Sequence, residues 1–210
     1  MNGMIKKQPS RTWPIWVSKA LQGVAYWVGH RQSLYSRHEL SEGALTAEIC
    51  NLIHANLQHP YLLRCEKLYR TFLPRDVRLP DKIAPNARAD LSVWERFEDK
   101  NGRYRPRPRY VIEVKRASAT RKRIDEELQR LAAVVERNER IRGFLFVIGE
   151  GRRPDRFVSE EGEAKKKRIR VDGFSSKYSV LRVWVATRSF KDKDRAHYAC
   201  LIEVARQLDR

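Results

Sequence analysis

The chain has few cysteines and no long apolar run, and both absences limit what it can be. Three cysteines in 210 residues are too few and too scattered for a disulfide framework or a zinc site. We therefore expect a protein of the reducing cytoplasm whose cysteines pack as small apolar groups. The apolar stretch over residues 13–28 is short and interrupted by polar residues, so it does not predict a membrane span or a secretion signal.

Several sequence signatures are also missing. The chain has no glycine-rich loop ending in Lys-Ser or Lys-Thr, and no Cys-x-x-Cys pair. It has no helix-turn-helix or zinc-finger pattern and no internal repeat. These absences argue against a nucleotide-triphosphate enzyme, a zinc enzyme and a protein that reads bases with a standard module. Any sequence specificity has to come from loops or from a partner protein.

Acidic residues are scarce relative to basic ones. The chain has 44 Lys and Arg against 26 Asp and Glu, which gives a net charge of +18. A globular protein with such a field attracts polyanions, of which nucleic acid is the commonest. An anionic membrane surface and an acidic protein are the alternatives, and a merely soluble basic surface is the simplest reading.

The hydrophobic periodicity predicts a single α/β architecture with a central mixed sheet flanked by helices. The order of elements is an N-terminal helix, a second helix, three strands that include a hairpin, a helix, a buried strand, and a final strand and helix. Helices are expected over residues 13–30, 41–58, 119–139 and 194–208, and strands over 61–72, 89–97, 110–116, 143–149 and 179–190, with a turn region over 99–108.

Two carboxylates and a lysine occur in strand-like apolar surroundings. Asp90 lies on one expected strand, and Glu113 and Lys115 lie two residues apart on the next, so the last two project from one face. The hairpin brings Asp90 alongside Glu113. Burying such charges is costly unless they are paired or bind a metal. Mg²⁺ is held by one or two carboxylates and supports phosphodiester hydrolysis, whereas alternating charges on an edge strand are most often simply solvated.

This order of elements resembles the PD-(D/E)xK nuclease superfamily, which includes restriction endonucleases, Holliday-junction resolvases and nucleases of defence and repair. The resemblance covers roughly residues 41–150. It implies a restriction-endonuclease-like core over 41–210, with residues 1–40 as a helical extension. It also implies that Asp90 and Glu113 bind Mg²⁺, with Mn²⁺ as a substitute, and that Lys115 is the catalytic lysine.

Two further residues match positions that some members of the superfamily use. Glu48 matches a helix glutamate that joins the metal site, with a surface ion pair as its simpler role, and Gln129 matches a glutamine of the following helix. The chain departs from the pattern in having Ala89 where the superfamily has proline. The long gap between Asp90 and Glu113 also requires an extended hairpin.

Basic residues cluster around these elements and are the expected nucleic-acid contacts. Some follow the Glu-x-Lys strand at the start of the next helix, where amide groups favour phosphate. Others lie in the hairpin or in a later run, for which a solvated loop is the alternative. They are Arg116, Arg121, Lys122, Arg123, Arg105, Arg107, Lys165, Lys166, Lys167 and Arg168.

The sequence therefore predicts a cytoplasmic Mg²⁺-dependent endodeoxyribonuclease acting in phage defence, repair or mobile-element processing. At this size it is expected to work as a homodimer or with an accessory protein. Two alternatives stay open: a nucleic-acid-binding subunit without catalysis, and an effector that cleaves RNA on the same fold.

Overall fold

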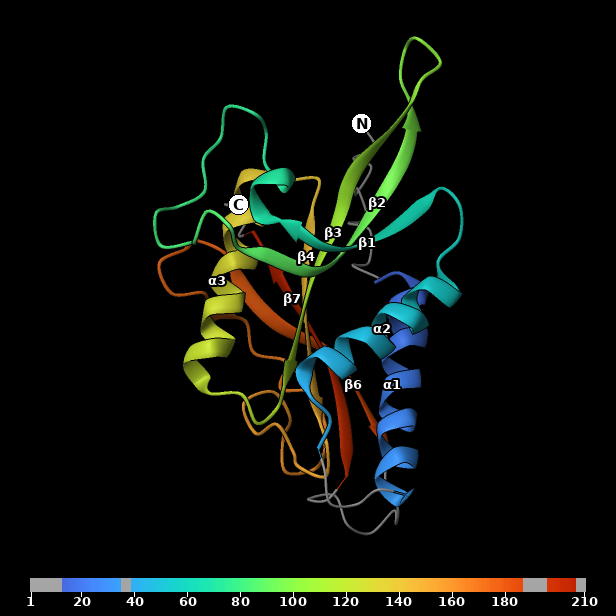
Figure 1. Ribbon diagram of the computed structural model, residues 1–210. Coiled ribbons are helices and arrows are strands. Elements are labelled where there is room, and N and C mark those ends of the chain that lie inside the picture. The colour runs from blue at the N-terminus through green and yellow to red at the C-terminus, as the bar shows by residue number, and fades with distance from the viewer. Residues whose placement is uncertain (1–12, 35–38, 187–195, 207–210) are drawn as a thin grey trace, which may run out of the picture.

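A seven-stranded mixed sheet forms the centre of the molecule (Figure 1). The computed structural model describes residues 13–34, 39–186 and 196–206. The strand order is β1-β2-β3-β4-β7-β6-β5, with β3 and β4 parallel and the other neighbours antiparallel. The strands are β1 (Tyr61–Leu68), β2 (Arg88–Glu98), β3 (Tyr104–Arg116), β4 (Arg142–Gly149), β5 (Ile169–Arg170), β6 (Lys177–Ala186) and β7 (His197–Ala205).

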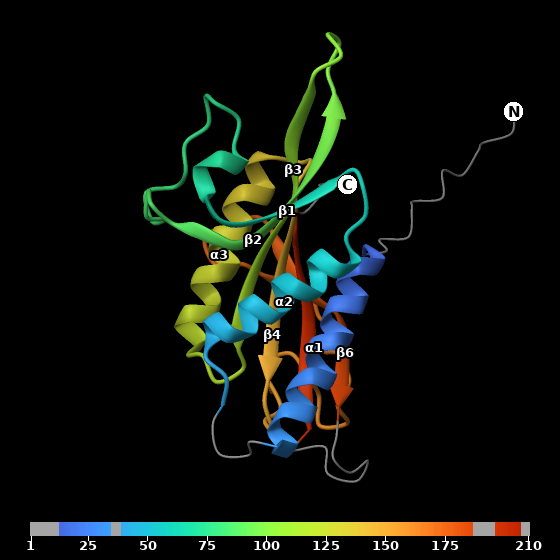
Figure 2. The same cartoon turned by 45° about the vertical axis from the view of Figure 1, so that its right-hand side comes forward.

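Helices cover both faces of the sheet, as expected for an α/β fold. α1 (Ile15–Leu34) and α2 (Glu42–Asn56) share one apolar cluster with one sheet face. α3 (Arg121–Arg137) and the short 3₁₀ helix η1 (Tyr69–Phe72) pack into a second cluster on the opposite face (Figure 2). The predicted N-terminal helix is therefore present, and it packs into the same cluster as α2.

The helices begin where side chains can cap them. Ser41 accepts a hydrogen bond from the N–H of Ala44 at 3.2 Å and so caps α2. Thr120 accepts from the N–H of Arg123 at 3.4 Å and caps α3 in the same way. Each helix then buries an apolar stripe against the sheet, which supplies most of its stability.

The C-terminal helix expected over residues 194–208 is wrong, because residues 197–205 form strand β7. β7 lies between β4 and β6, and it is buried on both faces. Tyr198 and Cys200 belong to the α3 side of the core, whereas Ala199 and Leu201 belong to the α1–α2 side. A strand buried on both faces has no alternation of polar residues, so its short apolar run can be mistaken for a helix.

Two other boundaries differ from the expectation. The strand expected over 61–72 ends at Leu68, and the chain continues as η1. The turn of the β2–β3 hairpin is confined to Asp99–Arg103, where the Asp99 carboxylate accepts the N–H groups of Asn101 and Arg103. Gly102 has φ 71°, a conformation that favours glycine. Residues 104–108, expected in the turn, are part of β3.

The hairpin extends beyond the rest of the sheet as a two-stranded ribbon (Figures 1 and 2). Here β3 pairs only with β2, because its pairing with β4 starts at Tyr110. Pro106 and Pro108 lie in this part of β3, opposite Arg96 and Trp94. Prolines fit an edge strand whose nitrogens face solvent, and they prevent another strand from adding to that edge.

The cysteines divide between the core and the surface. Cys200 is fully buried, as expected, but Cys65 is exposed and its Sγ lies 3.5 Å from the Sγ of Cys50. Burial and the neighbouring Cys65 raise the pKa of the Cys50 thiol to about 11. None of the described helices is both long enough and apolar enough to cross a bilayer.

Two glycines provide a matched test of this packing. A Cβ at Gly149 would lie 2.4 Å from the carbonyl oxygen of Arg152, whereas a Cβ at Gly43 in α2 would meet no atom within 4 Å. We expect Gly149→Ala to lower the free energy of unfolding by about 2 kcal/mol. Gly43→Ala should raise it by about 0.5 kcal/mol, since alanine favours the helix. Urea denaturation measures both, and equal effects would contradict the described turn after β4.

Candidate active site

The candidate site lies where β2 and β3 diverge. The pairing between these strands ends at Leu91 and Ile112, although each strand continues beside its other neighbour. Asp90 on β2 and Glu113 on β3 are the first residues beyond the last pair. The N–H of Val114 donates to Oδ2 of Asp90 at 2.7 Å, so a side chain replaces the missing backbone partner. This bond holds the Asp90 carboxylate beside Glu113.

Glu113 points to the α3 side of the sheet and is almost fully buried. Its Oε1 accepts a hydrogen bond from the hydroxyl of Tyr69 in η1. Burial raises the pKa of the Glu113 carboxyl well above its usual value, and the negative charges of Asp90 and Glu127 raise it further. The site therefore favours either a proton or a cation on this carboxyl group.

Lys115 lies on the same face of β3 as Glu113 and is held by two carboxylates. Its Nζ is 2.6 Å from Oε1 of Glu42, at the start of α2, and 3.2 Å from Oε1 of Glu127 in α3. Burial alone would lower the pKa of the Lys115 ammonium, but these glutamates and Asp90 outweigh it and hold the pKa above its usual value. Lys115 is therefore charged at neutral pH.

Glu127 connects this lysine to a second cation. Both of its carboxylate oxygens accept hydrogen bonds from Nη1 of Arg130, at 2.9 and 2.8 Å. Only 5% of Glu127 is exposed, compared with 7% of Lys115 and 1% of Glu113. A charged network this deeply buried is stable only if its members pair with one another.

The sequence analysis did not identify Glu42 and Glu127 as site residues, although the position of each relative to the apolar stripe of its helix indicated burial. Glu127 lies three residues after Ile124 and four before Leu131, within the buried stripe of its helix. Glu42 lies three residues before Leu45, so it shares a helix face with the core. A carboxylate within an apolar stripe is the pattern that would have identified them.

The structure does not bring Glu48 and Gln129 into the network. Both side chains are half-buried, and neither makes an ion pair or a side-chain hydrogen bond with another described residue. Glu48 is six residues after Glu42, which turns it away from the face that reaches Lys115. The metal role of Glu48 and the catalytic role of Gln129 stay predictions.

The donor set fits a hard divalent cation. Asp90 and Glu113 offer carboxylate oxygens at one point, although no group of three or more His, Cys, Asp or Glu suited to a metal occurs in the described residues. Mg²⁺ needs only one or two carboxylates because it keeps several waters. The raised pKa of Glu113 means that a bound cation would compete with a proton.

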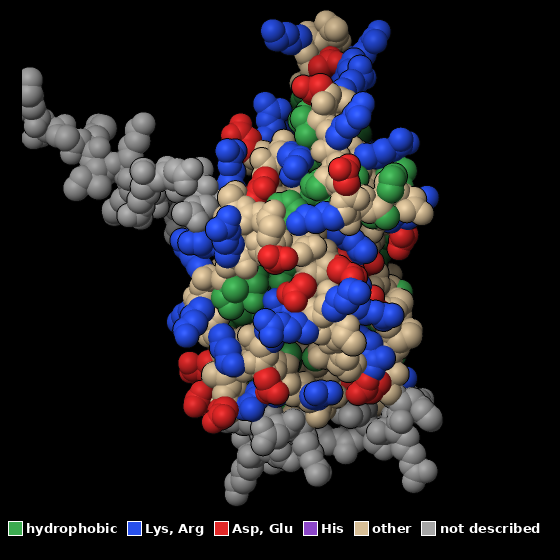
Figure 3. Space-filling view, turned by 90° about the vertical axis from the view of Figure 1, so that its left-hand side faces the viewer, with side chains coloured by type: hydrophobic (Ala, Val, Ile, Leu, Met, Phe, Trp, Pro, Cys, Tyr) green, Lys and Arg blue, Asp and Glu red, His purple; other side chains and the backbone are tan. Residues whose placement is uncertain are grey.

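The predicted nucleic-acid contacts form two groups, at opposite ends of β3. Figure 3 shows basic side chains spread over the molecular face that carries α3, with acidic and apolar ones between them. The first group, called here the carboxyl-end group, lies around the carboxyl end of β3. The run 165–168 is assigned to it because the next residue, Ile169, lines one cavity together with Arg121. The carboxyl-end group comprises Arg116, Arg121, Lys122, Arg123, Lys165, Lys166, Lys167 and Arg168.

The second group, Arg105 and Arg107, lies on the hairpin. Ten residues of β3 separate Arg105 from Lys115, which corresponds to about 33 Å of extended chain. Arg105 pairs with Asp99 and Arg107 pairs with Glu95, so both are partly neutralised. The hairpin arginines are therefore distant from the carboxylates, and any contact they make with nucleic acid is remote from them.

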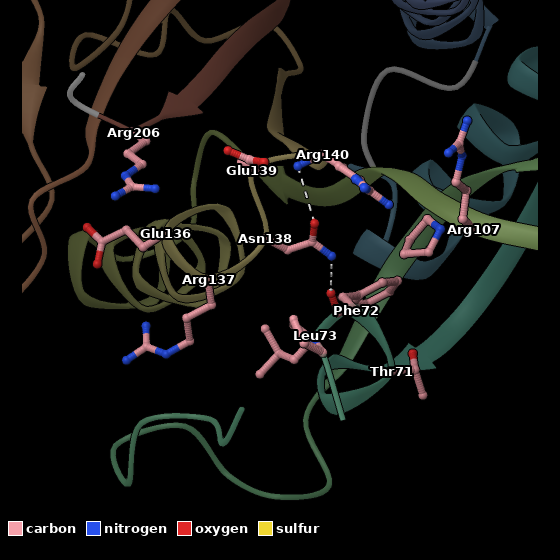
Figure 4. Close-up of a pocket in the computed structure, with 12 residues that line it drawn as sticks. Thr71, Phe72, Leu73, Arg107, Glu136, Arg137, Asn138, Glu139, Arg140 and Arg206 are labelled. Carbon is pink, nitrogen blue, oxygen red and sulfur yellow. Dashed lines mark hydrogen bonds between the residues drawn. The ribbon is translucent and has the colours of Figure 1, made fainter. Parts of the chain in front are cut away.

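A hollow of about 490 Å³ lies at the other end of α3 (Figure 4). Asn138 organises it by donating to the carbonyl oxygen of Phe72 and accepting from the N–H of Arg140. Figure 4 shows the side chains of Arg137, Arg140 and Arg206 pointing in different directions, so they do not converge on one ligand position. The hollow is also about 16 Å along α3 from Glu127.

No family model, curated protein or solved structure matches the chain. The interpretation of the site therefore depends on its residues and their geometry.

The buried Glu113 carboxyl makes a prediction about stability. Because the pKa of Glu113 is raised on folding, its contribution is complete below its unfolded value of about 4.5. That contribution is lost as the pH rises toward the folded value. In EDTA we expect the melting temperature to fall as the pH rises above about 4.5, and Mg²⁺ to oppose the fall. Differential scanning fluorimetry measures both effects.

Glu113→Gln is the control for this prediction. The amide keeps an acceptor for Tyr69 but cannot ionise, so the variant should show a smaller fall with pH and a weaker response to Mg²⁺. Identical pH and Mg²⁺ responses in the two proteins would show that Glu113 is not the titrating group.

Proposed function

We propose that this protein is a Mg²⁺-dependent endonuclease that hydrolyses phosphodiester bonds of DNA. The observation that carries the proposal is the convergence of Asp90, Glu113 and Lys115 where β2 and β3 part. The resemblance to the PD-(D/E)xK superfamily assigns metal binding and catalysis to these three residues. A restriction-endonuclease-like core is the corresponding proposal for the fold.

The residues have distinct roles in this proposal. When bound, Mg²⁺ supplies a Lewis acid and lowers the pKa of a coordinated water. Asp90 and Glu113 hold the cation, and the hydrogen bond from Val114 fixes the orientation of Asp90. Tyr69 orients Glu113 from the opposite side. These contacts fix both carboxylates before substrate binds, which lowers the cost of ordering them.

Lys115 supplies a positioned positive charge. An ammonium has three N–H donors, and Glu42 and Glu127 accept two of them. The third is left for an attacking water or a phosphate oxygen. Because the raised pKa keeps Lys115 protonated, it acts here as a hydrogen-bond donor and electrostatic stabiliser and not as a general base.

Charge supports a nucleic-acid substrate. The net charge of +18 favours a polyanion, and the carboxyl-end group follows the end of β3 that carries Glu113 and Lys115. DNA is the proposed substrate and RNA the alternative that the assay must separate. Defence, repair or mobile-element processing in the cytoplasm, as a homodimer or with a partner, are the proposed settings.

A cleavage assay tests the proposal directly. Labelled duplex, single-stranded and branched DNA and single-stranded RNA are incubated with Mg²⁺, Mn²⁺ or EDTA. We expect metal-dependent cutting of DNA that falls at least about 100-fold in Asp90→Asn and in Lys115→Ala. Asp90→Asn keeps an acceptor for the N–H of Val114 and should stay folded.

Lys19→Ala is the matched control for charge. Lys19 is exposed on α1, on the opposite side of the sheet from α3, so this variant should cut like the wild type. Cutting that survives in Asp90→Asn and Lys115→Ala would refute the proposed site. Salt-sensitive binding without cutting of any substrate would favour the non-catalytic binding subunit, and cutting of RNA alone would favour the RNA-cleaving effector.

The two glutamates of α2 can be separated by mutation. Glu42 contacts Lys115, whereas Glu48 was the glutamate predicted from the sequence. We expect Glu42→Gln to lower kcat about 10- to 100-fold, because it removes a group that orients Lys115. Glu48→Gln should change kcat little. If Glu48→Gln lowers kcat in the same cleavage assay and Glu42→Gln does not, the metal role predicted for Glu48 from the sequence is favoured.

A further inference from the structure

Two of the three cysteines lie side by side on the α1–α2 side of the sheet. Cys50 is in α2 and packs against the apolar cluster of that side. Cys65 is in β1, two residues after Leu63, which packs against the same cluster. Residues two apart on a strand share a face, so Cys65 also lies on the side that α2 covers. The two Sγ atoms are 3.5 Å apart, although 15 residues separate the cysteines in the chain.

The two thiols differ in their access to solvent. Cys65 is exposed, whereas Cys50 is half-buried. Burial first, and then the hydrogen bond and charge of Cys65, raise the pKa of the Cys50 thiol to about 11. Cys65 is therefore the thiol that a reagent from solvent can reach, and Cys50 is the one that the protein protects. An accessible thiol next to a second, resolving thiol is the arrangement that redox-responsive cysteines often have.

The pair fits oxidation better than metal binding. Among the described residues, no third His, Cys, Asp or Glu joins the two thiols in a group suited to a metal, and two thiols alone do not make a zinc site. A disulfide, in contrast, needs only that the sulfurs approach by about 1.5 Å. A change of side-chain rotamer at the exposed Cys65 is enough for such a movement.

The two cysteines belong to elements that flank the candidate site. α2 also carries Glu42, whose carboxylate is part of the charged network. β1 is an edge strand of the sheet, and Cys65 pairs with Leu91, the neighbour of Asp90 in β2. A covalent bond between the two cysteines would therefore fasten α2 to the edge of the sheet.

We propose that Cys50 and Cys65 are a reversible disulfide-forming site that small organic disulfides such as oxidised glutathione oxidise. The thiolate of Cys65 attacks one sulfur of the oxidant, which forms a mixed disulfide and releases one glutathione. Cys50 then gives up its proton and attacks the Cys65 sulfur, which closes the bond between α2 and β1 and releases the second glutathione. Two protein thiols are oxidised, one disulfide of the oxidant is reduced, and the two protons end on the two released thiols.

The first step makes the second one easier. Two of the three effects that raise the pKa of Cys50 come from the Cys65 thiol. Both are removed once Cys65 is in the mixed disulfide, so Cys50 ionises more readily at the moment when it has to attack. The inference concerns the chemistry of two thiols and does not depend on the proposed nuclease function.

Mass spectrometry of the full chain measures the reaction. The reduced protein is incubated with oxidised glutathione, and the remaining thiols are then alkylated in denaturant. We expect a monomer that has lost two hydrogens and is alkylated only at Cys200. Peptide mapping should place the bond between Cys50 and Cys65, and dithiothreitol should reverse it. A protein that is not oxidised, a mixed disulfide that persists, or a dimer joined through Cys65 would each overturn the proposal.

Two variants test the order of the steps. Cys50→Ser lacks the second thiol, so the reaction should stop at a mixed disulfide on Cys65. Cys65→Ser lacks the accessible thiol, and its Cys50 should gain glutathione at least about tenfold more slowly, because that thiol is half-buried. Circular dichroism verifies that both variants fold. Equal rates of glutathione addition in the two variants would contradict the proposed roles of the two thiols.

The cross-link should also stabilise the folded chain. Closing a loop of 15 residues restricts the unfolded state, so we expect the oxidised wild type to melt roughly 5–10 °C above the reduced protein. Cys65→Ser should melt at the same temperature after either treatment. A mapped disulfide that leaves the melting temperature unchanged or lowers it would show that the bond distorts the contact between α2 and β1, which overturns the proposed site.

Discussion

The hydrogen bond from Val114 to Asp90 determines how the rest of the site is arranged. It allows β2 to separate from β3 without leaving a buried N–H unsatisfied, and the gap it opens contains Glu113. Once the strands separate, η1 and α3 can place Tyr69 and Glu127 against the end of β3 that no longer pairs with β2.

Strand β3 connects two regions with different surroundings. At its carboxyl end, β3 pairs only with β4, faces α3 and carries buried charge. At the other end it pairs only with β2, and Pro106 and Pro108 protect its free edge. The strand spans 13 residues, from Tyr104 to Arg116. The basic hairpin and the carboxylates therefore lie toward opposite ends of one strand.

How much the sequence predicted depends on how local each interaction is. Asp90, Glu113 and Lys115 were predictable because a hairpin and a two-residue spacing fix their relation. Glu42 lies 73 residues from Lys115 in the chain, and no local pattern connects them. Strand β7 was mistaken for a helix for a related reason. Its apolar run reflects burial between β4 and β6, a tertiary feature that periodicity does not record.

The charge balance of the site runs opposite to that of the whole chain. Four carboxyl groups (Glu42, Asp90, Glu113 and Glu127) surround two cations, Lys115 and Arg130, in a protein of net charge +18. The basic surface favours polyanions, but this cluster would repel the phosphate of the substrate proposed above. The excess has to be neutralised first, by a proton on Glu113 or by a divalent cation. Only the cation leaves both carboxylates ionised, so in the proposed nuclease cation binding and the approach of the substrate would favour each other.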